Sequence, residues 1–190
     1  MRKITGLNTS QQYDHAIQLC SDIFFKKNKD YGTAWRILRP SSLTDQLYIK
    51  AKRIRSLEDK GEMRVKESVD LEFVGIVNYS VMALIQLASQ EFDEIDMPLD
   101  ELKEKYDHWI AATKALMMDK NHDYGEAWRD MRISSITDLI LMKLLRIKSI
   151  EENEGKTIIS EGLDANYQDI INYAVFALIK IQESKISKKQ

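Results

Sequence analysis

The sequence of 190 residues is poor in residues that interrupt helices or cross-link a chain. It contains two prolines and seven glycines, which leaves few positions where a helix must end. Its one cysteine, Cys20, excludes an internal disulfide, and its apolar neighbours predict buried packing. The formal net charge of −2 gives no electrostatic reason to expect binding to nucleic acid. We therefore expect a helical protein of the reducing cytoplasm.

The first 17 residues lack the apolar core of a signal peptide. One uncharged segment, residues 73–90, is long enough to span a membrane. It contains Asn78 and several other polar residues, and its counterpart in the second half of the chain carries Asp169 and Lys180. This composition favours a buried core helix, so we expect no contact with a membrane.

What the chain has instead is an internal repeat. Residues 27–36, KNKDYGTAWR, return at 120–129 as KNHDYGEAWR, with eight of ten positions identical. An identity of this length without a gap is the signature of a tandem duplication. Further identical pairs lie on both sides of the segment: Tyr13 and Tyr106, Lys50 and Lys143, Arg53 and Arg146, Glu67 and Glu161, Asp70 and Asp164, and Asn78 and Asn172.

The apolar spacing predicts three long helices in each repeat. The repeats are expected at 1–92 and 99–190, joined by a linker at 93–98 and sharing one core. We predict an all-α fold, a tandem duplication of a three-helix unit that forms a pseudo-symmetric helical bundle, with the repeats packed as an internal pseudo-dimer. Whether this pseudo-dimer pairs again into a homodimer is left open by the sequence. The expected helices span about 10–27, 41–59, 65–91, 100–119, 135–152 and 161–183. We expect Ser10 to cap the first helix and Pro40 to break the chain before the second. Gly32 and Gly61 are expected to end helices.

Two asparagines, Asn78 and Asn172, lie within apolar runs of the third helix of each repeat. A buried amide without a hydrogen-bond partner costs roughly 1–3 kcal/mol, so each needs a partner. Either the amide bonds a neighbouring backbone group, or it faces a ligand.

Acidic residues share the helical face of these asparagines. Glu67 and Asp70 are three residues apart, and Asn78 lies about 20° from Glu67 on a helix of 100° per residue. Such oxygen donors suit Mg²⁺ held jointly with substrate phosphates, although acidic residues also favour a helix N-terminus. The second repeat offers Glu161, Asp164, Asp169 and Asn172, and Asp138 at the start of a helix is either a further metal ligand or a first-turn charge.

Basic and aromatic residues recur in the same way. Lys50 and Arg53, like Lys143 and Arg146, share one face of the second helix of their repeat. They are candidates for neutralising phosphate, or else solvated surface charges. Further candidates for binding a substrate are Arg129, Arg132, Tyr124 and Trp128, although a tryptophan at this place either stacks on a base or fills the core.

The order of K-N-x-D-Y-G-x-A-W, a Lys-x-x-Arg helix and an Asn-Tyr helix resembles the nucleotide modification-associated domain 1 family. Residues 67–79 and 161–173 are similar to its third-helix signature, and the resemblance covers nearly the whole chain. The family pattern is in turn similar to the all-α nucleoside triphosphate pyrophosphohydrolases, the MazG-like and dimeric dUTPase-like enzymes. Those enzymes bind Mg²⁺ with an ExxE helix and an ExxD helix and cleave between the α- and β-phosphates.

The chain departs from this pattern in two respects. No ExxE motif is visible in the second helix of either repeat, and a position that relatives usually fill with aspartate is Gly75 in the first repeat and Asp169 in the second. We therefore expect the second repeat to have kept more of the site, with Glu161, Asp164 and Asp169 as catalytic and metal-binding residues. The resemblance implies Mg²⁺-dependent hydrolysis of a (deoxy)nucleoside triphosphate to monophosphate and pyrophosphate. The alternative is a non-catalytic helical module that binds a modified nucleotide or a protein partner.

Overall fold

The computed structural model describes residues 6–60, 68–89 and 95–187. Within these ranges all regular structure is helical, which confirms the predicted all-α fold. The elements are α1 (Thr9–Tyr31), the 3₁₀ helix η1 (Ala34–Ile37), α2 (Pro40–Lys60), α3 (Val69–Ala88), α4 (Leu99–Tyr124), the 3₁₀ helix η2 (Ala127–Asp130), α5 (Ile133–Glu152) and α6 (Leu163–Ser187).

The helices begin slightly away from the predicted places. Asn8, rather than Ser10, caps α1 in a capping box with Gln11, which satisfies two of the free N–H groups of the first turn. Pro40 does not break the chain but is the first residue of α2, a position where its missing N–H has no consequence. The third helix starts at Val69 instead of near residue 65, because Ser68 is extended.

Glycine ends the first helix of each repeat. Gly32 and Gly125 have φ of 59° and 63°, a left-handed backbone that L side chains rarely adopt. Helices α1 and α4 continue up to these glycines and end at Tyr31 and Tyr124, four and five residues beyond the predicted ends. The predicted helix end at Gly61 lies outside the described residues.

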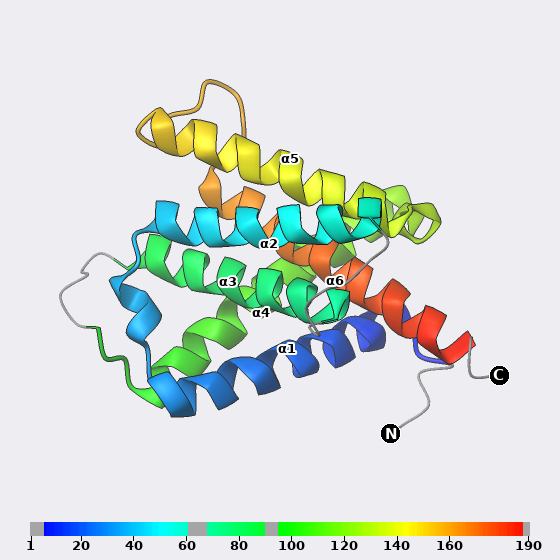
Figure 1. Cartoon of the computed structure of the whole chain (residues 1–190), viewed down its shortest axis with the longest axis horizontal. Coiled ribbons are helices and arrows are strands. Elements are labelled where there is room, and N and C mark those ends of the chain that lie inside the picture. Colours follow the sequence, from blue (N-terminus) through cyan, green and yellow to red (C-terminus); the bar gives the residue numbers. More distant parts are fainter. Residues whose placement is uncertain (1–5, 61–67, 90–94, 188–190) are drawn as a thin grey trace.

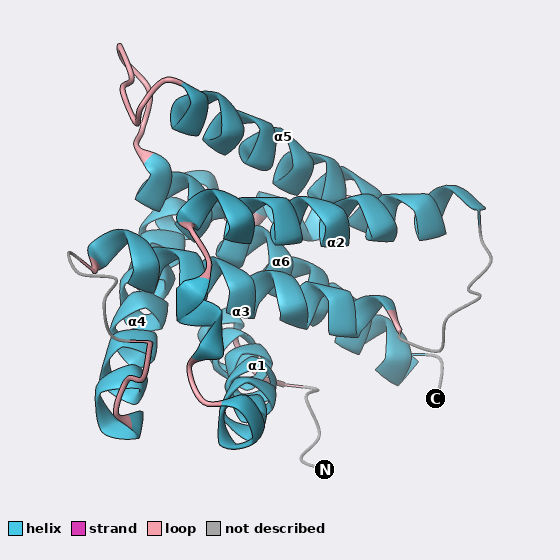
Figure 2. Ribbon diagram, turned by 60° about the vertical axis from the view of Figure 1, so that its left-hand side comes forward, coloured by secondary structure: helices cyan, strands magenta, loops and turns pink. Residues whose placement is uncertain are grey.

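The six α-helices form three layers (Figures 1 and 2). In the middle, α3 and α6 pack against each other, and α2 and α5 lie side by side on one face of this pair. On the other face α1 and α4 each contact both middle helices. One helix among the described residues, α3, is long and apolar enough to span a membrane, but 67% of its most apolar stretch of 18 residues is buried inside the fold. It is a core helix, as predicted.

The core follows the repeated apolar pattern. It contains the predicted stripe of α3, including Phe73, Val77, Val81 and Leu84, and its counterpart on α6. Cys20 is fully buried in it, and burial raises the pKa of its thiol to about 12, so the thiol packs as an apolar group.

Two mirrored hydrogen bonds cross between the repeats at the centre. The Tyr13 hydroxyl donates to Asn172 Oδ1 at 3.0 Å, and the Tyr106 hydroxyl donates to Asn78 Oδ1 at 3.0 Å. Each asparagine amide also donates to a backbone carbonyl in the first helix of its own repeat, at 3.2 and 3.0 Å. Both asparagines thus make the bonds to the backbone that the structural interpretation predicts. We call this pair of Tyr–Asn bonds the central ties.

A second set of mirrored contacts joins α2 to α5. Thr44 donates to Glu151 at 2.7 Å, and its counterpart Thr137 donates to Glu58 at 3.0 Å. Ion pairs flank both bonds in the same mirrored way: Asp45 with Lys148, and Asp138 with Arg55. Because each contact recurs with the repeats exchanged, residues related by the duplication occupy equivalent places in the bundle.

Candidate functional site

A cavity of about 610 Å³ opens in the first repeat, where the end of α1, η1, α2 and α3 meet. We call it the first-repeat cavity. Most of its wall comes from the repeated segment and from one face of α3: Lys27, Asn28, Tyr31, Gly32, Ala34, Trp35, Lys50, Glu72, Val74, Gly75, Asn78, Tyr79 and Met82 are among its lining residues. The fold thus gathers the repeated segment, Lys50 and the Asn-Tyr pair of α3 around one space.

The charged groups of this cavity are two lysines and one buried acid. The Lys50 ammonium lies 3.4 Å from Glu72 Oε2 and 5.6 Å from the centre of the Tyr79 ring. Glu72, only 2% exposed, also pairs with Arg53. Lys27 is exposed at the rim and has no ion-pair partner among the residues that the structure describes. The cavity therefore presents positive charge together with aromatic and amide groups.

The 3₁₀ helix that carries Trp35 is held in place by α3. The side-chain amide of Gln86 donates to the carbonyls of Arg36 and Leu38, both at 2.9 Å. The counterpart of Gln86 is Lys180, whose ammonium donates to the carbonyl of Arg129. In both repeats the aromatic turn is therefore anchored to the central helices.

The equivalent region of the second repeat is built around Asp169. Its two carboxylate oxygens each lie 2.6 Å from a lysine, Oδ1 from Lys120 and Oδ2 from Lys143. Burial alone would lower the pKa of Lys120, but the hydrogen bond and charge of Asp169 outweigh burial and raise it. Glu161 lies 3.8 Å from Lys143 and is mostly exposed. The structure thus brings together three of the predicted site residues, but as ion pairs.

The aromatic turn of the second repeat also differs. Trp128 is 6% exposed and stacks on Phe176, with ring centroids 4.3 Å apart and planes 3° from parallel. Its neighbour Arg129 lies over the indole and donates to Gln12 and to Glu183, at 2.7 and 3.0 Å. These two candidates for substrate binding therefore join α6 and the start of α1. Arg132 and Tyr124 are exposed.

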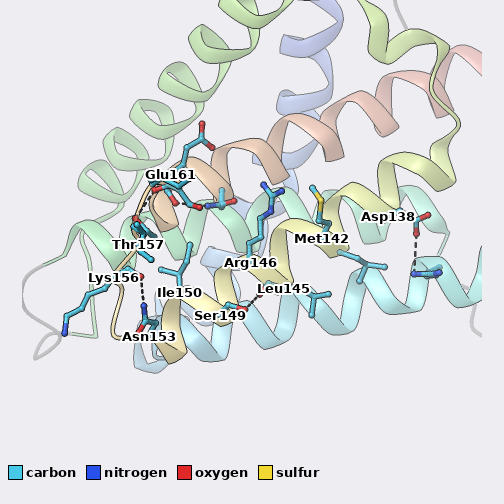
Figure 3. A pocket seen from close by; sticks show the side chains of 16 residues that line it. Asp138, Met142, Leu145, Arg146, Ser149, Ile150, Asn153, Lys156, Thr157 and Glu161 are labelled. Carbon is cyan, nitrogen blue, oxygen red and sulfur yellow. Dashed lines mark hydrogen bonds and ion pairs between the residues drawn. The ribbon is translucent and has the colours of Figure 1, made fainter.

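A larger and more open cavity, about 1150 Å³, lies beside the α5–α6 loop and α5 (Figure 3). Asp138, Arg146 and Glu161 line it, and the figure shows Asp138 and Glu161 at opposite ends of it. Asp138 is held there by Arg55 at 3.5 Å. This arrangement does not bring the predicted fourth metal ligand to the other acids.

The predicted Mg²⁺ ligands do not gather within the described part of the chain, where no three His, Cys, Asp or Glu side chains form a group that could hold a metal. Asp70 pairs with Lys185 at 2.6 Å and accepts from Ser68, and these hydrogen bonds lower its pKa against the opposing effect of burial. Asp164 is exposed, and Glu67 lies outside the described residues.

Comparison with known proteins identifies the family. The sequence profile of the family described as nucleotide modification associated domain 1 matches residues 27–87 and again residues 120–181. The chain belongs to this family. No curated protein and no solved structure gives a significant match. The two matches coincide with the two repeats, and the first of them contains most of the wall of the first-repeat cavity.

Within this member of the nucleotide modification associated domain 1 family, sequence reasoning missed two charged residues of the paired regions. Glu72 was overlooked because its counterpart is Asn166, so a search for identical pairs does not find it. Lys120, like its counterpart Lys27, stands in the repeated segment, but a lysine near a helix end is ordinarily solvated. Its signal was its identity in both repeats.

Proposed function

We propose that this protein binds a nucleotide in the first-repeat cavity. One observation carries the proposal: the family-matched segment 27–87 folds so that most of its motif residues line a single cavity together with Lys27 and Lys50. The volume of about 610 Å³ falls within the range of roughly 300–1,000 Å³ that is usual for small-molecule sites.

The lining supplies what each part of a nucleotide requires. Trp35 and Tyr31 offer aromatic faces, and stacking of a base on such a face contributes about 1–3 kcal/mol. Lys27 and Lys50 offer ammonium groups that neutralise phosphate. Asn28 adds an amide that can hydrogen-bond a base edge or a sugar hydroxyl.

The family resemblance extends the proposal to hydrolysis of a (deoxy)nucleoside triphosphate to monophosphate and pyrophosphate, as in the MazG-like enzymes. The donor set within the described residues does not suit Mg²⁺, since Asp169 is neutralised by two lysines and Glu72 by Lys50 and Arg53. We therefore derive no step through a metal. Dependence on Mg²⁺ and a contribution of Glu67 stay predictions, and the proposed site lies in the first repeat, not in the second, where the sequence led us to expect it.

The test is titration of the full chain with nucleoside mono- and triphosphates, with ordinary and modified bases, in Mg²⁺ and in EDTA. Calorimetry reports binding, and release of pyrophosphate reports turnover. Mg²⁺-dependent release supports hydrolysis, and binding without release supports the non-catalytic alternative. Absence of heat and of any thermal shift with every nucleotide would overturn the proposal.

The duplication supplies a matched control. Tyr31 and Tyr124 are similarly exposed, at 72% and 78%, but Tyr31 lines the first-repeat cavity and Tyr124 does not. Tyr31→Ala should weaken nucleotide binding at least about fivefold, which corresponds to about 1 kcal/mol of stacking. Tyr124→Ala should leave the affinity unchanged. Equal effects of the two substitutions would place the ligand elsewhere.

A further inference from the structure

Both repeats carry the same pair of lysines, but among the described residues only the second repeat places one carboxylate in contact with both, whereas Glu72 of the first repeat pairs with Lys50 and not with Lys27. There Asp169 accepts from Lys120 and from Lys143, both at 2.6 Å, and both Asp169 and Lys143 are 8% exposed. The corresponding lysines of the first repeat, Lys27 and Lys50, line the first-repeat cavity. The second repeat thus displays which kind of group the lysine pair accepts, namely an oxyanion.

In the first repeat the position of Asp169 is Gly75. A Cβ atom at Gly75 would lie 3.1 Å from Lys50 Cε and 3.3 Å from its Nζ. An oxygen that enters the cavity beside Gly75 is therefore within reach of the Lys50 ammonium. The absence of a side chain lets Lys50 lie directly against the backbone of α3, where Lys50 and Gly75 both line the cavity.

The surroundings of the repeated tryptophan also differ between the two repeats: they are filled in the second and open in the first. In the second repeat Phe176 stacks in parallel on Trp128, with centroids 4.3 Å apart. The corresponding residues of the first repeat are Met82 and Trp35, and both line the cavity. A flat ring thus covers the tryptophan in one repeat, and a flexible side chain leaves it facing the cavity in the other.

Asp169 and Phe176 are seven residues apart on α6, which is about 10 Å along a helix. Residues seven apart lie on the same face of a helix. This face of α6 thus carries an anion and a flat ring, the two kinds of group that the phosphate and the base of a nucleotide present.

We infer that the second repeat is occupied by its own side chains, with Asp169 in place of a phosphate and Phe176 in place of a base. It follows that the chain binds one ligand, in the first repeat, with the phosphate between Lys27 and Lys50 beside Gly75 and the base on Trp35. This inference rests on the proposed nucleotide site and adds the orientation, the anion site and the stoichiometry.

The decisive variants transfer these side chains to the first repeat. The full chain is titrated calorimetrically with deoxynucleoside 5′-monophosphates and with inorganic pyrophosphate as a probe of the anion site. Gly75→Asp should weaken both probes at least about tenfold, because a carboxylate competes for the lysines. Gly75→Asn, of the same size without the charge, should weaken them much less. Met82→Phe should weaken the nucleotide and leave pyrophosphate unchanged.

The reverse exchange tests the stoichiometry. Asp169→Gly combined with Phe176→Met should raise the number of nucleotides bound per chain from one to two, and the Gly75 variants remain informative if this double variant does not fold. One nucleotide bound with equal affinity by wild type, Gly75→Asp and Gly75→Asn would overturn this inference and leave the proposed function intact. Two nucleotides bound per wild-type chain would also overturn this inference and leave the proposed function intact. Binding of pyrophosphate that Gly75→Asp abolishes, without binding of any nucleotide, would support the anion site and overturn the proposed function.

Discussion

The two repeats share their skeleton and differ in the space between their helices. The central ties each use one residue from either repeat, Tyr13 with Asn172 and Tyr106 with Asn78. Neither copy of such a residue can change without breaking a bond to the other repeat. The contact itself therefore explains why these polar identities persisted after the duplication.

The wall of the first-repeat cavity keeps most of the repeated segment, and the repeats diverge at several of its positions on the central helices. Gly75 corresponds to Asp169, Met82 to Phe176, and Glu72 to Asn166. Each change in the second repeat either fills space or forms a local bond: Asn166, for example, donates to the carbonyl of Gly162 at 2.7 Å. The comparison therefore indicates which positions on the central helices decide whether the space beside the repeated segment stays open.

The largest difference between the repeats should appear at the two tryptophans. Trp128 is 6% exposed and stacked on Phe176, so Trp128→Ala should lower the free energy of unfolding by about 3–5 kcal/mol. Trp35 is only partly buried beside a cavity, so Trp35→Ala should cost less than about 2 kcal/mol. Urea denaturation followed by circular dichroism measures both. Equal losses would mean that the two aromatic turns are packed alike.

The second-largest difference in stability loss is expected between substitutions of the two buried acids, Asp169 and Glu72. Asp169→Asn leaves Lys143, which is 8% exposed, without its closest counter-charge and should cost about 3 kcal/mol. Glu72→Gln should cost only about 1 kcal/mol, because Lys50 and Arg53 are 27% and 30% exposed and can be hydrated. Denaturation at low and high salt measures the pair. A larger loss for Glu72→Gln would contradict the view that the second repeat holds the more deeply buried ion pair.

Most of the fold was predictable from the sequence. The repeated segment indicated the duplication, and apolar spacing together with scarce glycine and proline located six helices. The errors lie at helix ends, where the capping geometry of Asn8 and the permissive first-turn position of Pro40 decided the boundary. Such ends depend on local hydrogen bonds that spacing alone does not reveal.

The site was harder to predict, because identical polar residues were taken as signs of ligand binding. Asp138 illustrates the difficulty: its identity with Asp45 is explained by ion pairs across α2 and α5, which depend on how those helices pack. At Gly75 the sequence indicates the loss of an acidic ligand, and only the structure reveals that this position lines a cavity. Pairwise identity within one chain does not distinguish a contact between repeats from a contact with a ligand.

Removing either of the two central ties should lower the stability of the protein by the same amount. Tyr13→Phe and Tyr106→Phe each leave a buried asparagine oxygen without its tyrosine donor, so each should cost about 1–2 kcal/mol. Burial raises the pKa of both phenols, so both hydroxyls remain donors into alkaline solution and the cost should not change between pH 6 and about 9. Urea denaturation of each variant checks this. Losses that differ by more than about 1 kcal/mol would show that the two ties are not equivalent.

The smallest effect is expected at Glu58 and Glu151, which accept from Thr137 and Thr44. Partial burial raises the pKa of both carboxyls above 4.5, and the threonine hydrogen bonds only partly oppose it. Between the unfolded and the raised folded pKa the folded chain binds more protons, so stability falls as pH rises through that window. Glu58→Gln and Glu151→Gln keep an acceptor without the charge, and each should stabilise the protein by less than about 1 kcal/mol at pH 7 and not at pH 4. Thermal denaturation at the two pH values measures this, with the exposed Glu152→Gln as the control that should show no such change. If one substitution changes stability at pH 7 and the other does not, the two glutamates are not equivalent. The mirrored threonine–glutamate bonds would then differ in how deeply they are buried.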